Sequence, residues 1–173
     1  NSETAAWSSW TTVSEQFAAD SYGWSLMDID LTRYAGSTVR FAFYHVADRD
    51  SLDRASESSG WYIDDIEFAV KQPNFTGDFE CGWEDWTANN GVWQIGAPTA
   101  GAPYAYSGQN CAGTVLNGNY PGYTDSRLTS ATIAVPSAGN MQLTFYHWYS
   151  YSSLDSGYIQ VSTLDEATGA WSS

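Results

Sequence analysis

The stretch Val39-Arg40-Phe41-Ala42-Phe43-Tyr44 alternates its side chains between two faces, which is the period of a half-buried β-strand. The same period recurs in two further stretches, Met141-Gln142-Leu143-Thr144-Phe145-Tyr146 and Tyr158-Ile159-Gln160-Val161-Ser162. Clusters of Gly, Pro, Asn, Asp and Ser separate such stretches at spacings too short for helical crossovers. The sequence therefore predicts an all-β antiparallel sandwich, with Glu15 to Ala19 as the one short candidate for a helical turn.

Composition narrows the class of protein. The chain has 173 residues, which is about the size of one domain, and its 20 acidic and 6 basic side chains give a net charge of −14. Six cations can hardly build a phosphate-binding patch, so we expect no nucleic-acid partner. No apolar run reaches the roughly 18 residues of a membrane span, so we expect no membrane insertion. A single lysine with abundant Ser, Thr, Gly, Trp and Tyr suits a secreted protein, extracellular or at the cell surface.

The sequence contains an internal echo at an offset of 102 residues. Phe43-Tyr44-His45 matches Phe145-Tyr146-His147, and Ser51-Leu52-Asp53 then falls on Ser153-Leu154-Asp155. Two similar strand-loop-strand units on facing sheets would explain the echo, as would chance convergence of two core strands. We favour the first interpretation.

A second echo joins the two ends of the chain. Residues 3–9 resemble residues 166–173. Placed tail to head, the two ends would form one hairpin, so we expect the chain to begin and end within the second strand of that hairpin. Three tryptophans, Trp7, Trp10 and Trp171, lie at this junction and are the candidate assembly residues.

The order of motifs resembles a known family when the chain is followed from Asp78. Asp78-Phe79-Glu80 and the ending Gly60-Trp61-Tyr62-Ile63-Asp64-Asp65-Ile66 resemble the first and last strands of a MAM-like jelly roll. The pattern is closer still to the bacterial domains that accompany immune inhibitor A-type metallopeptidases, since MAM modules usually carry more than two cysteines. The resemblance implies a jelly-roll sandwich in permuted order, with residues 78–173 as its first half, 71–77 as a linker and 1–70 as its second half.

Three arrangements would produce this permuted order. The chain is one period of a tandem array, a circularly permuted domain, or a subunit completed by its neighbour. A half sandwich exposes strand edges and an apolar face, which a strand from a partner would cover. We therefore expect copies of the chain to associate head to tail, in a filament or surface assembly.

Calcium is the cofactor that the acidic residues favour, because Ca²⁺ takes six to eight oxygen ligands, often from loops. One candidate group is Asp64, Asp65, Asp78 and Glu80, which the resemblance would bring together. Neighbouring residues of a strand point to opposite faces, so one of Asp64 and Asp65 is expected to be a structural hydrogen-bond acceptor. A second candidate group is Asp48, Asp50 and Asp53, whose alternative partners are Arg49 and Arg54.

No catalytic motif is found, and we expect no enzymatic activity. The chain has neither His-Glu-x-x-His nor Gly-x-Ser-x-Gly, and its two histidines are His45 and His147. Their matching places in the echoed strands favour hydrogen-bonded structural histidines over a shared metal site.

Aromatic residues offer a platform for carbohydrate, because planar rings stack on sugar faces. The candidate glycan-binding residues are Tyr123, Trp148, Tyr149 and Tyr151, with Tyr104, Tyr106 and Tyr120 in nearby loops. The alternative is that these rings fill the core or an interface.

Two covalent features remain open. Cys81 and Cys111 could form one disulfide, or could be two buried thiols. Asn74 begins the glycosylation sequon Asn74-Phe75-Thr76, which matters only in a host that modifies it.

The sequence as a whole predicts an extracellular, structural or adhesive module, and the alternative is a carbohydrate-binding accessory module of a secreted enzyme.

Overall fold

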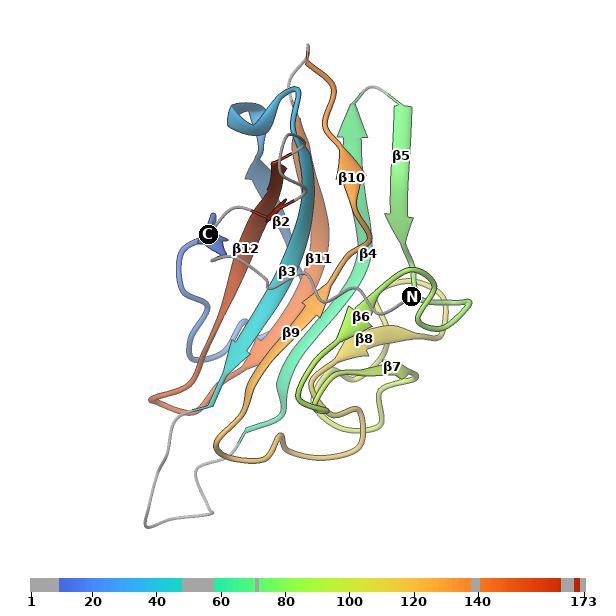
Figure 1. Ribbon diagram of the computed structural model, residues 1–173. Coiled ribbons are helices and arrows are strands. Elements are labelled where there is room, and N and C mark those ends of the chain that lie inside the picture. The colour runs from blue at the N-terminus through green and yellow to red at the C-terminus, as the bar shows by residue number, and fades with distance from the viewer. Residues whose placement is uncertain (1–9, 48–57, 71, 138–140, 166–169, 172–173) are drawn as a thin grey trace.

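The fold is a sandwich of two antiparallel sheets (Figure 1). The computed structural model describes residues 10–47, 58–70, 72–137, 141–165 and 170–171. The first sheet has the order β1 (Thr11–Thr12), β12 (Ser156–Asp165), β3 (Thr38–Val46), β9 (Asp125–Thr129) and β6 (Thr87–Ala88), with β10 (Ile133–Ala134) beside β3 and β13 (Ala170–Trp171) beside β12. The second has the order β2 (Ser25–Asp30), β11 (Gln142–Ser150), β4 (Gly60–Val70), β8 (Cys111–Gly113) and β7 (Gln94–Gly96), with β5 (Gln72–Gly77) beside β4. The predicted all-β antiparallel sandwich is confirmed.

The predicted helical turn at residues 15–19 is wrong. Within the described residues the helical element is the short 3₁₀ turn η1 (Thr32–Tyr34), and none of the helices there is long and apolar enough to cross a membrane. Phe17 instead forms a bridge with Gly157, through backbone hydrogen bonds in both directions. Its ring lies 5.3 Å from that of Trp61, so this segment closes the edge of the core.

The echoed units lie on facing sheets, as predicted. The chain passes from β3 in the first sheet to β4 in the second, and from β11 in the second sheet to β12 in the first. Phe43 and Phe145, which match in the echo, meet edge to face between the sheets with ring centroids 5.1 Å apart. Apolar side chains of the alternating strands therefore form one core between the two layers.

Both histidines are buried in that core and hydrogen-bonded, as the structural interpretation predicts. Nε2 of His45 lies 2.9 Å from Thr124 Oγ1, and its Nδ1 lies 3.3 Å from the Tyr151 hydroxyl. The indole N–H of Trp61 donates to Nδ1 of His147 over 3.4 Å. Burial lowers the pKa of each histidine to about 4, so both are neutral at pH 7.

The two predicted halves interleave within one chain. β11 lies between β2 and β4, and β12 lies between β1 and β3. The first and last strands share one edge of β12, where Thr11 is opposite Val161 and Trp171 is opposite Leu164. Strands from the two ends of the chain are thus sheet neighbours, while head-to-tail association with further copies stays a prediction.

The predicted linker needs a correction. Residues 72–77 form β5, which returns along β4 as the second strand of a hairpin, with Ile66 opposite Gly77 and Val70 opposite Gln72. The turn-forming residues of this segment therefore pair in the sheet, because the edge of β4 offers unpaired backbone groups beyond the short β8.

Gly60 is required where the chain enters β4. Its φ of +96° is strained for any other residue, and a Cβ there would overlap Thr114 Oγ1 and lie 2.9 Å from Cδ1 of Tyr120. We predict that Gly60→Ala lowers the free energy of unfolding by about 3 kcal/mol in urea titrations, from overpacking and backbone strain. Gly118→Ala is the matched control, because a Cβ there meets nothing within 4 Å. Equal stability of the two variants would contradict this assignment.

The buried histidines predict a loss of stability in weak acid. Their folded pKa of about 4 lies below the unfolded value of 6.5, so the unfolded chain takes up protons first as the pH falls. Their contribution is complete above pH 6.5 and is lost between pH 6.5 and 4, by up to about 3 kcal/mol per histidine. His147→Gln, whose amide oxygen can still accept from Trp61, should show a shallower decline in urea titrations across this range. An unchanged slope would refute the role of His147.

Candidate functional site

The outward face of the second sheet carries an aromatic surface. Strand alternation points Tyr146 and Trp148 away from the core, because the intervening His147 points into it. Tyr106 stacks on Tyr146 with ring centroids 3.5 Å apart and an interplanar angle of 11°, and Trp24 meets Tyr106 edge-on. We call this surface the outer aromatic face and define it by six residues, Trp24, Leu26, Tyr104, Tyr106, Tyr146 and Trp148.

A loop that folds back over β4 holds this surface together. The indole N–H of Trp24 donates to the carbonyl of Tyr104 over 2.9 Å. The Tyr62 hydroxyl lies 2.7 Å from the carbonyl oxygens of both Ala100 and Val115. Tyr62 also packs edge to face on Trp148. A second, smaller core thus lies under the loop, and leaves Tyr104 64% and Tyr106 40% exposed.

Two carboxylates hold the same loop through its backbone. Asp64 is fully buried and accepts from the N–H of Asp65 and, over 3.1 Å, from the N–H of Ser107. The Ser107 hydroxyl donates to Asp65. Oε1 of Glu80 accepts from two further loop amides, those of Gln109 and Asn110. These acidic residues, from the middle of β4 and from the turn after β5, therefore position the loop.

The predicted calcium residues only partly converge. Asp64 and Asp65 both reach Ser107, because β4 is irregular here, with Asp65 at a φ of +48° and a register shift against β11. Burial raises the pKa of Asp64 to about 7. Asp78 accepts from the Glu80 N–H through its own carboxylate. In the part of the chain that the structure describes, no group of three or more His, Cys, Asp or Glu side chains is placed to hold a metal ion. Asp48, Asp50 and Asp53 lie outside the described residues.

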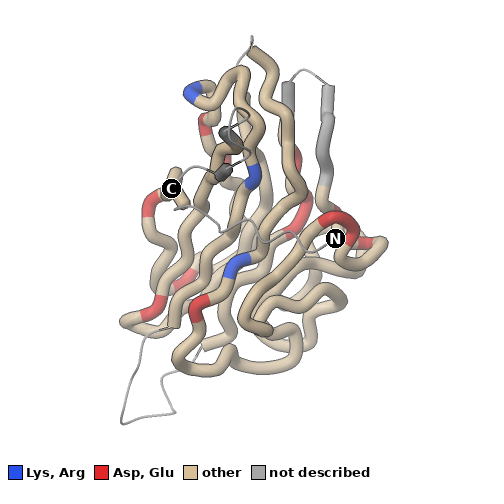
Figure 2. Tube along the Cα trace, in the orientation of Figure 1, with Lys and Arg blue, Asp and Glu red and all other residues tan. Residues whose placement is uncertain are grey.

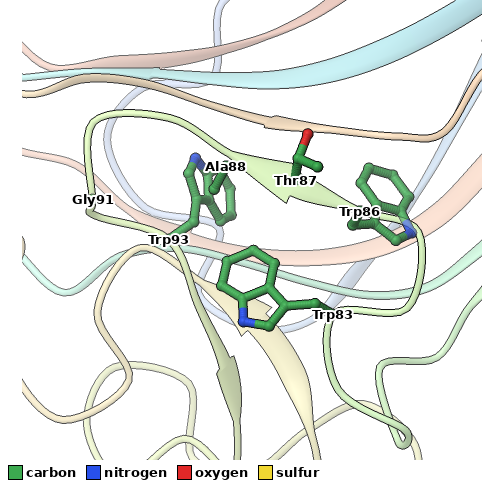
Figure 3. Close-up of a pocket in the computed structure, with 6 residues that line it drawn as sticks. All are labelled: Trp83, Trp86, Thr87, Ala88, Gly91 and Trp93. Carbon is green, nitrogen blue, oxygen red and sulfur yellow. The ribbon is translucent and has the colours of Figure 1, made fainter. Parts of the chain in front are cut away.

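A second aromatic site lies where the edge strands of the two sheets meet. Three tryptophans, Trp83, Trp86 and Trp93, line a pocket of about 360 Å³ together with Thr87, Ala88 and Gly91. Figure 3 shows the ring of Trp83 below those of Trp86 and Trp93, on the side of Trp93. We call this site the tryptophan pocket. It is flanked by the acidic turn between β5 and β6, which is prominent in Figure 2.

Neighbouring residues of a strand point to opposite faces, so the predicted glycan-binding residues do not share one surface. Trp148 lies on the outer aromatic face, with Tyr104 and Tyr106 beside it. Tyr149 and Tyr151 pack against the core, where their rings are 6.1 Å apart, and Tyr120 is fully buried. Tyr149 and Tyr151 therefore fit the alternative that these rings contribute to packing in the core. Tyr123 is 59% exposed on the loop that leads into β9 of the other sheet.

The cysteines and the assembly residues have the following places. Both cysteines are free thiols, Cys81 exposed and Cys111 buried in the smaller core, so the predicted disulfide is not formed and only Cys111 fits the alternative of a buried thiol.

Trp10 packs under the guanidinium groups of Arg40 and Arg127 of the same chain. Trp7 lies outside the described residues, as do the side chains of Trp171 and Asn74, whose backbones belong to β13 and β5.

Sequence reasoning missed Trp24, Tyr146 and the tryptophan pocket. A signal for Tyr146 was available, because residues 146 and 148 of one strand share a face. Trp24 and Trp83 come from loops that no periodicity places, so only the fold brings them to these surfaces.

Comparison with known proteins gives one informative similarity. No protein-family model matches the chain, and no solved structure matches it. Among curated proteins, the chain is 32% identical over 114 residues to Bacillopeptidase F of Bacillus subtilis (strain 168). The match covers 62% of this chain and 8% of Bacillopeptidase F, so the chain spans less than a tenth of that relative.

Proposed function

We propose that the chain is a non-catalytic, carbohydrate-binding accessory module of a longer extracellular protein. The similarity to a short part of Bacillopeptidase F supports an accessory role, since the name of that protein denotes a peptidase and the matched part is a small fraction of it. Composition supports an extracellular location, with a single lysine and a large share of Ser, Thr, Gly, Trp and Tyr.

The stacked pair Tyr106 and Tyr146 is the observation that carries this proposal. The two rings are parallel and stacked face to face, and Tyr106 remains 40% exposed, so the pair leaves accessible ring surface of the kind on which a pyranose ring stacks. Leu26, 48% exposed on the neighbouring β2, extends the apolar surface. Contiguous exposed apolar surface of this kind marks binding sites on soluble proteins.

Polar groups beside the rings supply the second requirement for a sugar. Asp28 accepts from the Thr144 hydroxyl over 2.8 Å on adjacent strands of the same face. Asp65 and Ser107 border the other side, beside Tyr106. Carboxylates and hydroxyls accept from and donate to sugar hydroxyls. With a net charge of −14, the chain is suited to neutral glycans and not to sulfated or uronic ones.

Substitution of Tyr106 tests the carbohydrate proposal. Tyr106 belongs to a loop and is 40% exposed, so Tyr106→Ala should preserve the fold. Loss of one stacking ring should weaken binding to a neutral oligosaccharide found on a glycan array by about three- to tenfold in isothermal titration calorimetry. Tyr123→Ala, an exposed tyrosine near the other sheet, is the control and should bind like the parent protein. A broad array without any bound glycan would refute the proposal.

Calcium is proposed as a structural ion beside Asp64 in the middle of β4. The carboxylate of Asp64 is buried beside that of Asp65, and a divalent cation would offset the cost of burying this charge. Because fewer than three acidic side chains converge there, carbonyl or water oxygens would complete the shell.

Thermal unfolding with and without calcium tests this part of the proposal. Binding to the folded state alone raises the melting temperature, so Ca²⁺ should raise it relative to a chelator. Asp64→Asn removes the buried charge and should abolish that difference. Identical melting of the parent protein in Ca²⁺ and in chelator would exclude a structural ion, and would leave the carbohydrate proposal untouched.

A further inference from the structure

We propose that the tryptophan pocket binds a small organic cation, an alkylammonium group such as the trimethylammonium of choline. This site is separate from the outer aromatic face. It lies by β6 and β7, the edge strands of the two sheets, whereas Tyr146 and Trp148 lie on the central strand β11 of the second sheet.

The pocket has a rigid aromatic floor. Trp86 is 3% exposed and its ring lies 5.8 Å from that of Phe43 and 5.7 Å from that of Phe79. Trp93 is equally buried, with its ring 6.0 Å from that of Trp61. Both rings are therefore held by the core before any ligand arrives, which limits the entropy lost on binding. Each leaves only a small part of its surface open to the pocket, so Trp83 supplies most of the accessible aromatic surface.

Trp83 supplies a side of the pocket that remains open to solvent. Its side chain is 40% exposed, and Figure 3 shows its ring below the other two indoles of the pocket. The turn that carries it closes with a hydrogen bond from the Trp86 N–H to the Trp83 carbonyl over 2.8 Å. Two of the three indoles thus flank a single tight turn.

The charge around the pocket favours a cation. Glu84 and Asp85 form the tip of the turn between Trp83 and Trp86, and both are exposed. Partial burial raises the pKa of the Glu84 carboxyl, and the nearby carboxylates of Asp78 and Asp85 raise it further. The faces of indole rings are negative as well, so rings and carboxylates attract the same kind of ligand.

The polar lining of the pocket argues against a neutral sugar. Among the six lining residues, Thr87 carries the one side-chain hydroxyl, and Figure 3 shows it pointing away from Trp83. A sugar needs several hydrogen-bond partners, whereas an alkylammonium group needs aromatic faces and a negative field. A phosphate next to the ammonium group would be repelled by Glu84 and Asp85, so the ligand is a free alkylammonium compound.

A titration with choline and its uncharged analogue tests the proposal. Choline chloride should quench or shift the tryptophan fluorescence of the full chain in a saturable way. The uncharged analogue is a dimethylbutanol in which a carbon atom replaces the nitrogen of choline, and it should bind much more weakly than choline. Phosphocholine should also bind more weakly than choline. Equal binding of choline and its neutral analogue, equal binding of phosphocholine, or no saturable binding of choline would each overturn the proposal.

Variants of the exposed residues distinguish the contribution of the Trp83 ring to choline binding from that of the nearby carboxylates. Trp83→Leu keeps an apolar side chain and should weaken choline binding about two- to fivefold, whereas Trp83→Phe should retain part of it. The double variant Glu84→Gln with Asp85→Asn should weaken binding and remove its dependence on salt. Asp20→Asn, an exposed acidic residue near β11, is the charge control and should bind like the parent protein. Unchanged binding in both the Trp83→Leu and the double variant would overturn the assignment.

Discussion

The burial of Trp61 is the constraint on which the rest of the structure depends. Its indole is fully buried on β4 and touches rings from both sheets, including Phe43 on β3 and His147 on β11. Its polar groups are also satisfied, because its backbone N–H donates to Thr114 Oγ1 and its indole N–H to His147. A ring of this size leaves no room for a Cβ at Gly157, which would lie 2.7 Å from it. The aromatic packing therefore requires glycine at this position of β12 in the facing sheet.

The same strand determines what lies on the opposite face. Since Trp61 and Ile63 point inward, Tyr62 and Asp64 point outward, where they would meet water in an open sandwich. The loop from Ala100 to Asn110 covers both of them, by hydrogen bonds to the Tyr62 hydroxyl and the Asp64 carboxylate. This cover brings Tyr106 onto Tyr146. The outer aromatic face is thus a consequence of satisfying two polar groups of β4.

The abundance of aromatic residues has two structural explanations in this molecule. Rings on the inner faces, such as Phe43, Phe145 and Tyr151, fill the core between the sheets. Rings at the margins, such as Tyr106 and Trp83, remain 40% exposed beside acidic residues. In the part of the chain that the structure describes, Arg127 pairs with Asp125, and acidic residues such as Asp78, Glu84 and Asp85 are exposed. Exposed rings within a negative field are suited to neutral or cationic ligands.

The sequence by itself determined the two-layer antiparallel architecture, because alternation along Val39–Tyr44, Met141–Tyr146 and Tyr158–Ser162 gives each strand one side for the core. It did not show that the other side of β3 and β12 is buried as well, at Arg40, Ala42, Gln160 and Ser162. It also placed the echoed strands on facing sheets and both histidines in hydrogen-bonded, buried positions. It could not show that residues 72–77 pair as β5, or that the loop from Ala100 to Asn110 brings Tyr106 onto Tyr146. Only the tertiary structure decided which loops cover which face, since the rings of Trp24, Trp83 and Tyr106 reach their sites through contacts between residues distant in the chain. Local periodicity determines the face of a strand, whereas the partners on that face depend on how the whole chain folds back on itself.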